Sequence, residues 1–160
     1  MHLILWRHAE AEDPGPAGDL ARVLTAHGRR QARRMADWLR PRLPRHCAVI
    51  ASPAVRTRTT AAALQPGYAL DERLAPGADA AAVLAACGWP DGGRRGGAVL
   101  VVGHQPTLGQ VASLLLTGAQ ADWSVRKGAI WWLSTRERDA HDQVVLRAVL
   151  SPDLIGQDVA

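Results

Sequence analysis

The sequence has few cysteines and few aromatic residues, and its apolar runs are short. Cys47 and Cys87 lie far apart, and neither has a partner at metal-ligand spacing, so we expect no disulfide and no zinc site. Aromatic residues make up only 4% of the chain, which is low for a surface that stacks nucleic-acid bases. No apolar run approaches the roughly 20 residues that span a bilayer. We therefore expect neither nucleic acid nor a membrane as a partner.

Lysine is almost absent as well. Lys127 is the only one, and the net charge of +4 comes almost wholly from arginine. A compositional bias of the genome would explain this, and so would an electropositive cleft for an anionic substrate. The first residues also lack the basic start and cleavage site of a signal peptide, which predicts a cytoplasmic protein. The length of 160 residues predicts a single domain over residues 1–160.

Three short apolar runs are the strongest structural signal in the chain. They cover residues 3–6, 47–51 and 98–102, and each is followed by polar or turn-forming residues. A continuous apolar run with such boundaries is typical of a strand buried on both faces of a parallel sheet. Ligands bind beyond the carboxyl ends of strands in sheets of this kind. Functional side chains are therefore expected directly after these three runs.

The residues after the three runs suit phosphate chemistry. Arg7 and His8 follow the first run, Arg56 lies in the helix after the second, and His104 follows the third. An arginine binds phosphate through paired hydrogen bonds, and a neutral imidazole can attack phosphorus. If the three strands are neighbours, one pocket holds two imidazoles and at least two guanidiniums. Such a pocket would hold a phosphoryl group between the two histidines.

The remaining pattern predicts the fold class. Thr25 is expected to cap a helix, Ser52 to cap a second one that starts at Pro53, and Asp79 to cap a short alanine-rich helix. Residues 129–134 and 144–150 are typical of a terminal hairpin joined by a charged turn. Alternating strands and helices predict a three-layer α/β sandwich, with a mostly parallel sheet, helices on both faces and an antiparallel edge.

Two charged or glycine-rich segments are given structural interpretations. The arginine cluster at residues 29–34 is interpreted as the exposed face of a helix. The glycine-rich segment at residues 88–97 is interpreted as a surface loop. It precedes a strand and does not open a helix, so it lacks the Walker pattern of a phosphate-binding loop.

The chain also resembles a known family, the phosphoglycerate-mutase-like histidine phosphatase superfamily. That superfamily is known for an Arg-His-Gly signature, whose third position here is Ala9. The closer resemblance is to its SixA-type phosphohistidine phosphatase branch. The motifs that carry the resemblance occur in order along the chain and are Arg7-His8-Ala9-Glu10-Ala11, Arg22-Val23-Leu24-Thr25 with Gly28, Ser52-Pro53 with Arg56 and Thr60, Leu74-Ala75-Pro76, and Gly103-His104-Gln105-Pro106.

The resemblance implies roles for five residues. His8 would be the nucleophile that takes the phosphoryl group, and water would then cleave the phosphoenzyme. Arg7 and Arg56 would clamp the phosphate oxygens, with Arg22 as a further contact. His104 would donate to the same oxygens, and its positive charge would stabilise the transferring group. No metal and no cofactor are expected, because arginines replace the usual cation.

The general acid is the open part of this expectation. Larger members of the family protonate an ester oxygen with a carboxylate placed after the third strand. Glu72 and Asp79 lie near that region, but we favour a surface charge for Glu72 and a helix cap for Asp79. A missing acid matters less for a phosphoramidate, because a protonated imidazole leaves readily. This favours phosphohistidine on proteins, such as histidine phosphotransfer domains, as the substrate.

Two other functions remain as alternatives. One is a phosphatase of small phosphorylated metabolites, and the other is a non-catalytic phosphate-binding or interaction module. Family members that enclose a small substrate usually have longer insertions than a chain of 160 residues can hold. The presence of both histidines and the arginines argues against a module without activity. The sequence leaves the oligomeric state open.

Overall fold

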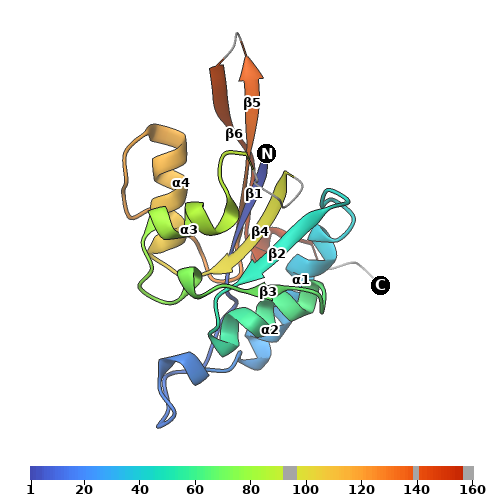
Figure 1. Ribbon diagram of the computed structural model, residues 1–160. Coiled ribbons are helices and arrows are strands. Elements are labelled where there is room, and N and C mark those ends of the chain that lie inside the picture. The colour runs from blue at the N-terminus through green and yellow to red at the C-terminus, as the bar shows by residue number, and fades with distance from the viewer. Residues whose placement is uncertain (92–96, 139–140, 157–160) are drawn as a thin grey trace.

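A single six-stranded sheet forms the centre of the molecule. The computed structural model describes residues 1–91, 97–138 and 141–156. The strand order is β3-β2-β4-β1-β5-β6 (Figure 1). The strands are β1 (His2–Arg7), β2 (Cys47–Ala51), β3 (Ala69–Leu70), β4 (Ala98–Gly103), β5 (Ile130–Arg138) and β6 (His141–Leu150).

Parallel pairing aligns the carboxyl ends of three strands. β1 and β2 both pair in parallel with β4, and β3 pairs in parallel with β2. The register joins Arg7 to Gly103 and Ala51 to Val102, so β1, β2 and β4 end at the same edge of the sheet. β5 pairs antiparallel with β1, and β6 antiparallel with β5. The predicted parallel sheet with an antiparallel edge is therefore confirmed.

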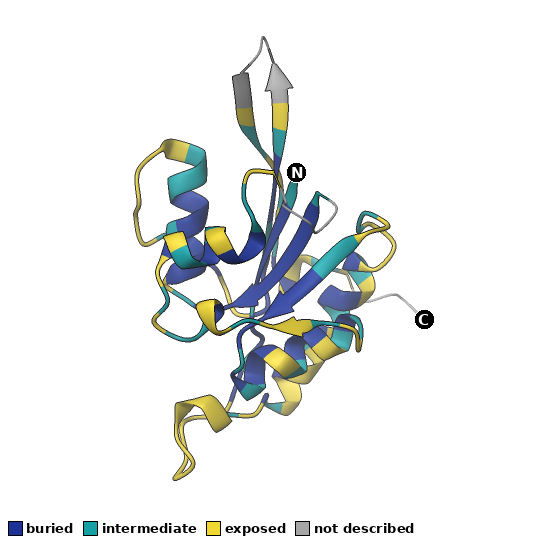
Figure 2. Cartoon of the chain, viewed as in Figure 1, coloured by how far each residue is buried: buried dark blue, intermediate teal, exposed yellow. Residues whose placement is uncertain are grey.

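Helices cover both faces of the sheet and give three layers. Leu3 and Leu5 of β1 pack in the same core as α3 (Ala80–Cys87) and α4 (Thr107–Thr117). Ile4 and Trp6 pack against α1 (Ala26–Leu39) and α2 (Val55–Leu64) on the other face. The central strands are buried accordingly (Figure 2). None of the helices in the described ranges is long and apolar enough to cross a membrane.

Two helices begin where the sequence predicts. Thr25 caps α1, since its side chain accepts a hydrogen bond from the backbone N–H of Gly28 at 2.8 Å. Asp79 caps α3 in the same way, accepting from the N–H of Ala82 at 2.7 Å. Both predicted caps are confirmed.

The predicted cap of α2 is wrong. The helix begins at Val55 rather than at Pro53, and no side chain caps it. The hydroxyl of Ser52 lies instead 2.8 Å from Nε2 of His104, so this serine contacts the histidine that follows β4 and does not cap the helix. Arg56 is consequently the second residue of α2 and projects from its first turn.

The terminal hairpin is longer than its apolar residues indicate. β5 continues to Arg138 and β6 starts at His141, so residues 135–138, expected in a turn, belong to a strand. The hairpin projects beyond the other strands (Figure 1). Residue 139 of the predicted turn, and residues 92–96 of the glycine-rich segment with Arg94 and Arg95, lie outside the described residues.

Candidate active site

Two histidines and an arginine meet at the common strand edge. His8 follows β1, His104 follows β4, and Arg56 comes from α2. The two imidazole centroids lie 5.3 Å apart. The guanidinium of Arg56 donates from Nε to Nε2 of His8 and from one terminal nitrogen to Nδ1 of His104, each at 3.3 Å. Only 7% of His8, 5% of His104 and 3% of Arg56 is exposed, so the cluster is nearly dry.

The hydrogen bonds of His8 assign its proton. Nδ1 lies 2.8 Å from the carbonyl oxygen of Ala9, which can only accept, so Nδ1 carries the hydrogen. Nε2 then holds a lone pair that faces Arg56. Burial lowers the pKa of His8 to about 4, with the charges of Arg56 and Arg7 acting in the same direction. At neutral pH the ring is therefore neutral, with its basic nitrogen aimed into the cluster.

His104 has the opposite proton arrangement. Because a guanidinium only donates, Nδ1 of His104 accepts from Arg56, and Nε2 carries the hydrogen that it donates to Ser52. Burial, followed by the charge of Arg56, lowers the pKa of His104 to about 3. The positive charge expected on this ring is thus not present at neutral pH. An anion bound beside the ring would raise the pKa again.

Arg7 offers an unused donor at the end of β1. One terminal nitrogen donates to the carbonyl oxygen of Val125 at 2.7 Å. Its Nε is buried and is the one buried side-chain nitrogen or oxygen within the described residues that has no hydrogen-bond partner. A buried donor without a partner is costly, and an oxygen of a bound phosphate would satisfy it.

A carboxylate that sequence reasoning missed links the arginines. Asp19 lies in the short 3-10 helix η1 (Asp19–Ala21). One of its carboxylate oxygens lies 2.9 Å from Arg56 and the other 3.1 Å from Arg22, and its carbonyl oxygen accepts from Arg56 at 2.7 Å. Partial burial opposes ionisation, but the hydrogen bonds from Arg22 and Arg56 lower the pKa of Asp19 below its ordinary value. The residue therefore stays ionised and holds the two guanidiniums together.

The other two carboxylates considered from the sequence lie elsewhere. Glu72 is exposed in the short 3-10 helix η2 (Glu72–Leu74), and Asp79 is occupied as the cap of α3. Across the described ranges, neither carboxylate shares a hydrogen bond or ion pair with the histidine cluster. The same residues contain no group of three or more His, Cys, Asp or Glu side chains that could hold a metal ion. The positive charge at this edge comes from arginines.

The segment after His8 is held by close backbone contacts. The N–H of Ala9 donates to the buried hydroxyl of Thr60 at 3.1 Å, and the carbonyl of His8 accepts from Gly128 at 3.1 Å. Gly28 of α1 lies so close to Glu10 that an added Cβ would collide with the Glu10 carbonyl oxygen. This packing requires glycine at position 28 and fixes the direction in which the His8 ring points.

Comparison with known proteins places this geometry in a family. The sequence model of the histidine phosphatase superfamily (branch 1) matches residues 3–77. A candidate phosphohistidine phosphatase SixA from Nakamurella multipartitia is 31% identical, with 94% of this chain and 95% of that chain covered and a TM-score of 0.72. The chain belongs to the histidine phosphatase superfamily.

Further SixA structures support this assignment. The protein histidine phosphatase SixA in complex with tungstate is 25% identical, with a TM-score of 0.77 over 96% of this chain and 98% of that chain. A candidate SixA from Agrobacterium tumefaciens, at 22% identity and a TM-score of 0.73 over 94% of this chain and 97% of that chain, shares the fold. No curated protein sequence matches. The predicted SixA-type branch is confirmed, and the chain is a histidine phosphatase.

Proposed function

We propose that this phosphatase removes the phosphoryl group from phosphohistidine on proteins, through a covalent intermediate on His8. The observation that carries the proposal is the neutral His8 ring, whose Nε2 lone pair faces the Arg56 guanidinium beside the second imidazole. Nucleophile, cation and second histidine are held in one buried cluster before any substrate arrives. Such preorganisation is what phosphoryl transfer requires, because its catalysis depends mainly on positioning and charge.

In the first step, Nε2 of His8 attacks phosphorus. A bond forms between phosphorus and Nε2, and the bond between phosphorus and the substrate imidazole breaks. The released electron pair stays on the substrate nitrogen. Arg56 and the unpartnered Nε of Arg7 would bind the phosphoryl oxygens as negative charge moves across them. His104, next to the same anion, would then become protonated more readily.

In the second step, water attacks the phosphorylated His8. The new oxygen–phosphorus bond replaces the bond to Nε2, whose electron pair returns to the ring. Inorganic phosphate leaves and the water proton passes to solvent. His8 is thereby restored in the tautomer that the Ala9 carbonyl selects.

The choice of phosphohistidine rests on the state of the nearby carboxylate. Asp19 is ionised between two arginines, so it has no proton to give to a leaving group. An alkyl alcohol leaves poorly without such a proton. Phosphohistidine avoids the requirement, because a proton already present on its other ring nitrogen lets neutral imidazole depart.

A side-by-side rate comparison tests the proposal. The values of kcat/KM are measured on a phosphorylated histidine phosphotransfer domain and on small esters, including a sugar phosphate and phosphoserine. We expect the phosphohistidine protein to be the best substrate. Faster hydrolysis of the sugar phosphate would overturn the substrate assignment in favour of small metabolites.

A trapping experiment tests the intermediate separately. Quenching the reaction with radiolabelled substrate should leave acid-labile, base-stable phosphate on the wild-type protein and none on His8→Ala. The matched control is His46→Ala, which removes an exposed histidine and should still be labelled. Label on the His8→Ala protein would place the nucleophile elsewhere.

The single domain over residues 1–160, the cytoplasmic location, and the lack of nucleic-acid and membrane partners stay predictions.

A further inference from the structure

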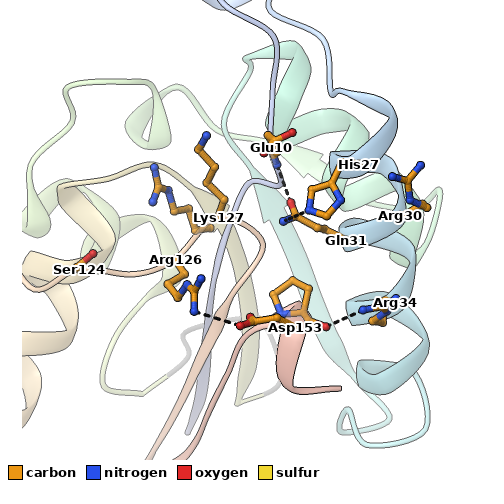
Figure 3. Close-up of a pocket in the computed structure, with 11 residues that line it drawn as sticks. Glu10, His27, Arg30, Gln31, Arg34, Ser124, Arg126, Lys127 and Asp153 are labelled. Atoms are coloured by element: carbon orange, nitrogen blue, oxygen red, sulfur yellow. Dashed lines mark hydrogen bonds and ion pairs between the residues drawn. The ribbon is translucent and has the colours of Figure 1, made fainter. Parts of the chain in front are cut away.

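A cavity rich in positive charge is lined by Arg7, the residue that precedes His8, and by Glu10, two residues after it. It has a volume of about 480 Å³ and opens between α1 and the segment before β5 (Figure 3). Five cationic side chains line it, against the two carboxylates of Glu10 and Asp153. We call it the basic cavity and define it by those cations, which are Arg7, Arg30, Arg34, Arg126 and Lys127.

The wall of the basic cavity is joined to the catalytic residues. Arg7 belongs to both, and it donates to the carbonyl of Val125 in the segment that forms one side. Further along that segment, the N–H of Gly128 donates to the carbonyl of His8 at 3.1 Å. On the other side, Gln31 of α1 accepts from the N–H of Glu10 at 3.0 Å. A substrate whose phosphoryl group lies at His8 would therefore present its neighbouring atoms to this cavity.

Two of the cations have no partner among the residues that the structure describes. Within the described ranges, neither the guanidinium of Arg30 nor the ammonium of Lys127 makes a hydrogen bond or ion pair. The other outer cations are engaged, since Arg126 pairs with Asp153 at 3.1 Å and Arg34 donates to the carbonyl of Pro152 at 3.1 Å (Figure 3). Arg30 and Lys127 are thus available to bind negative groups of a ligand.

The positively charged surface along α1 is longer than a small metabolite. A second hollow of about 520 Å³ shares Arg30 and Arg34 with the basic cavity and continues along α1 to Trp38. From His27 to Trp38 the helix rises by about 16 Å. An extended polypeptide covers this length with about five residues. The arginines of α1 therefore line a continuous surface that is long enough for about five residues of an extended polypeptide.

We infer that the basic cavity binds an acidic stretch of the polypeptide that carries the phosphohistidine, with Arg30 and Lys127 contacting its carboxylates. This inference rests on the proposed function and adds to it a class of substrate protein, one with Asp or Glu beside the modified histidine. The contacts are exposed, so their contribution is modest and decreases as salt increases.

Binding is tested first without catalysis. Two labelled, unphosphorylated peptides of equal length share a central histidine, flanked by Glu and Asp in one and by Gln and Asn in the other. Fluorescence anisotropy at low salt should show the acidic peptide binding about tenfold more tightly than its neutral twin. In the double variant Arg30→Gln/Lys127→Gln this preference should disappear. The matched control, Arg45→Gln/Arg58→Gln, removes two exposed arginines outside the cavity and should keep it.

Three results would overturn the inference. The first is an equal preference for the acidic peptide in the wild type and in Arg30→Gln/Lys127→Gln. The second is a single-stranded oligonucleotide that binds the cavity more tightly than the acidic peptide, which would indicate a nucleic-acid partner. The third is a small bisphosphate that depends on Arg30 and Lys127 when the acidic peptide does not, which would indicate a metabolite.

Phosphorylated forms of the same peptides separate this inference from the proposed function. A higher kcat/KM for the acidic phosphopeptide, lost in Arg30→Gln/Lys127→Gln, supports both. If neither phosphopeptide is hydrolysed but the acidic peptide still binds, the substrate assignment fails and the binding site stands. If both are hydrolysed and bound equally well, the binding site fails and the substrate assignment stands.

Discussion

Two neighbouring regions of this protein use positive charge in opposite ways. In the histidine cluster at the strand ends, Arg56 is 3% exposed and donates four hydrogen bonds, to both histidines and to Asp19. In the basic cavity, Arg30 and Lys127 are exposed and have no partner within the described residues. Arg7 lies between the two regions, because it lines the cavity and is the last residue of β1, the strand that leads to His8.

This difference in burial and hydrogen bonding suits the buried cation to catalysis and the exposed cations to substrate binding. A buried guanidinium held by four hydrogen bonds has little freedom to reorient, so its positive charge is positioned for a phosphoryl group before the reaction. Exposed cations are mobile and screened by salt, so each contributes little to affinity but can attract an acidic partner. Substitutions in the cluster should therefore abolish turnover, and those in the cavity should change substrate preference.

The largest effect is expected for His8→Ala. Because His8 is the proposed nucleophile, its removal should eliminate the covalent route and decrease kcat on p-nitrophenyl phosphate by more than about 1,000-fold. Steady-state kinetics measure this, with His46→Ala as the control and circular dichroism to check folding. A decrease of only a few-fold would show that His8 is not the attacking group.

The next largest effect is expected for Arg56→Lys. A lysine keeps the charge but cannot bridge His8, His104 and Asp19 at once, because it lacks the planar fork of the guanidinium. We expect kcat to fall by about 100-fold. The control is Arg58→Lys, at an exposed position two residues further along the same helix. Equal turnover in Arg56→Lys and wild type would show that charge alone is sufficient.

The buried histidines should also make stability depend on pH. An unfolded imidazole binds a proton below about pH 6.5, whereas folded His8 and His104 resist protonation until about pH 4 and about pH 3, since burial lowers each pKa. The unfolded state binds more protons in this window, so stability falls as pH decreases from 6.5 towards 4. The slope is up to about 1.4 kcal/mol per pH unit for each histidine.

Urea unfolding at a series of pH values measures this slope. His8→Gln should flatten it, and His46→Gln, at an exposed position, is the matched control. An unchanged slope in His8→Gln would mean that this ring is not buried in its neutral form.

The smallest effect is expected for Asp19→Asn. A neutral amide no longer offsets the positive charges of Arg22 and Arg56. Both guanidiniums should therefore attract an added oxyanion more strongly. Vanadate should inhibit the variant about fivefold more tightly than the wild type. Weaker inhibition would show instead that the carboxylate acts mainly by holding Arg56 in position.

Much of the fold could be predicted from local patterns. The three apolar runs became β1, β2 and β4 because uninterrupted β-branched and aliphatic residues fit a strand buried on both faces. Thr25 and Asp79 cap their helices because capping is a contact between residues three apart. The prediction that Ser52 caps α2 is wrong because its hydroxyl forms a hydrogen bond with His104, 52 residues away.

The candidate site shows the same division between features that local sequence patterns predict and features that depend on long-range contacts. The convergence of His8, His104 and Arg7 follows from the sequence, because residues at the ends of neighbouring parallel strands meet at one edge of the sheet. The position of Asp19 and the basic cavity do not follow from the sequence. Asp19 reaches Arg56 of α2, and the segment before β5 reaches Arg7 and His8, through contacts between residues far apart in the chain that no periodicity encodes. The sequence alone thus determined which chemical groups stand at the strand ends. Only the tertiary structure decided their proton positions, because each depends on a donor or acceptor brought in by another part of the chain.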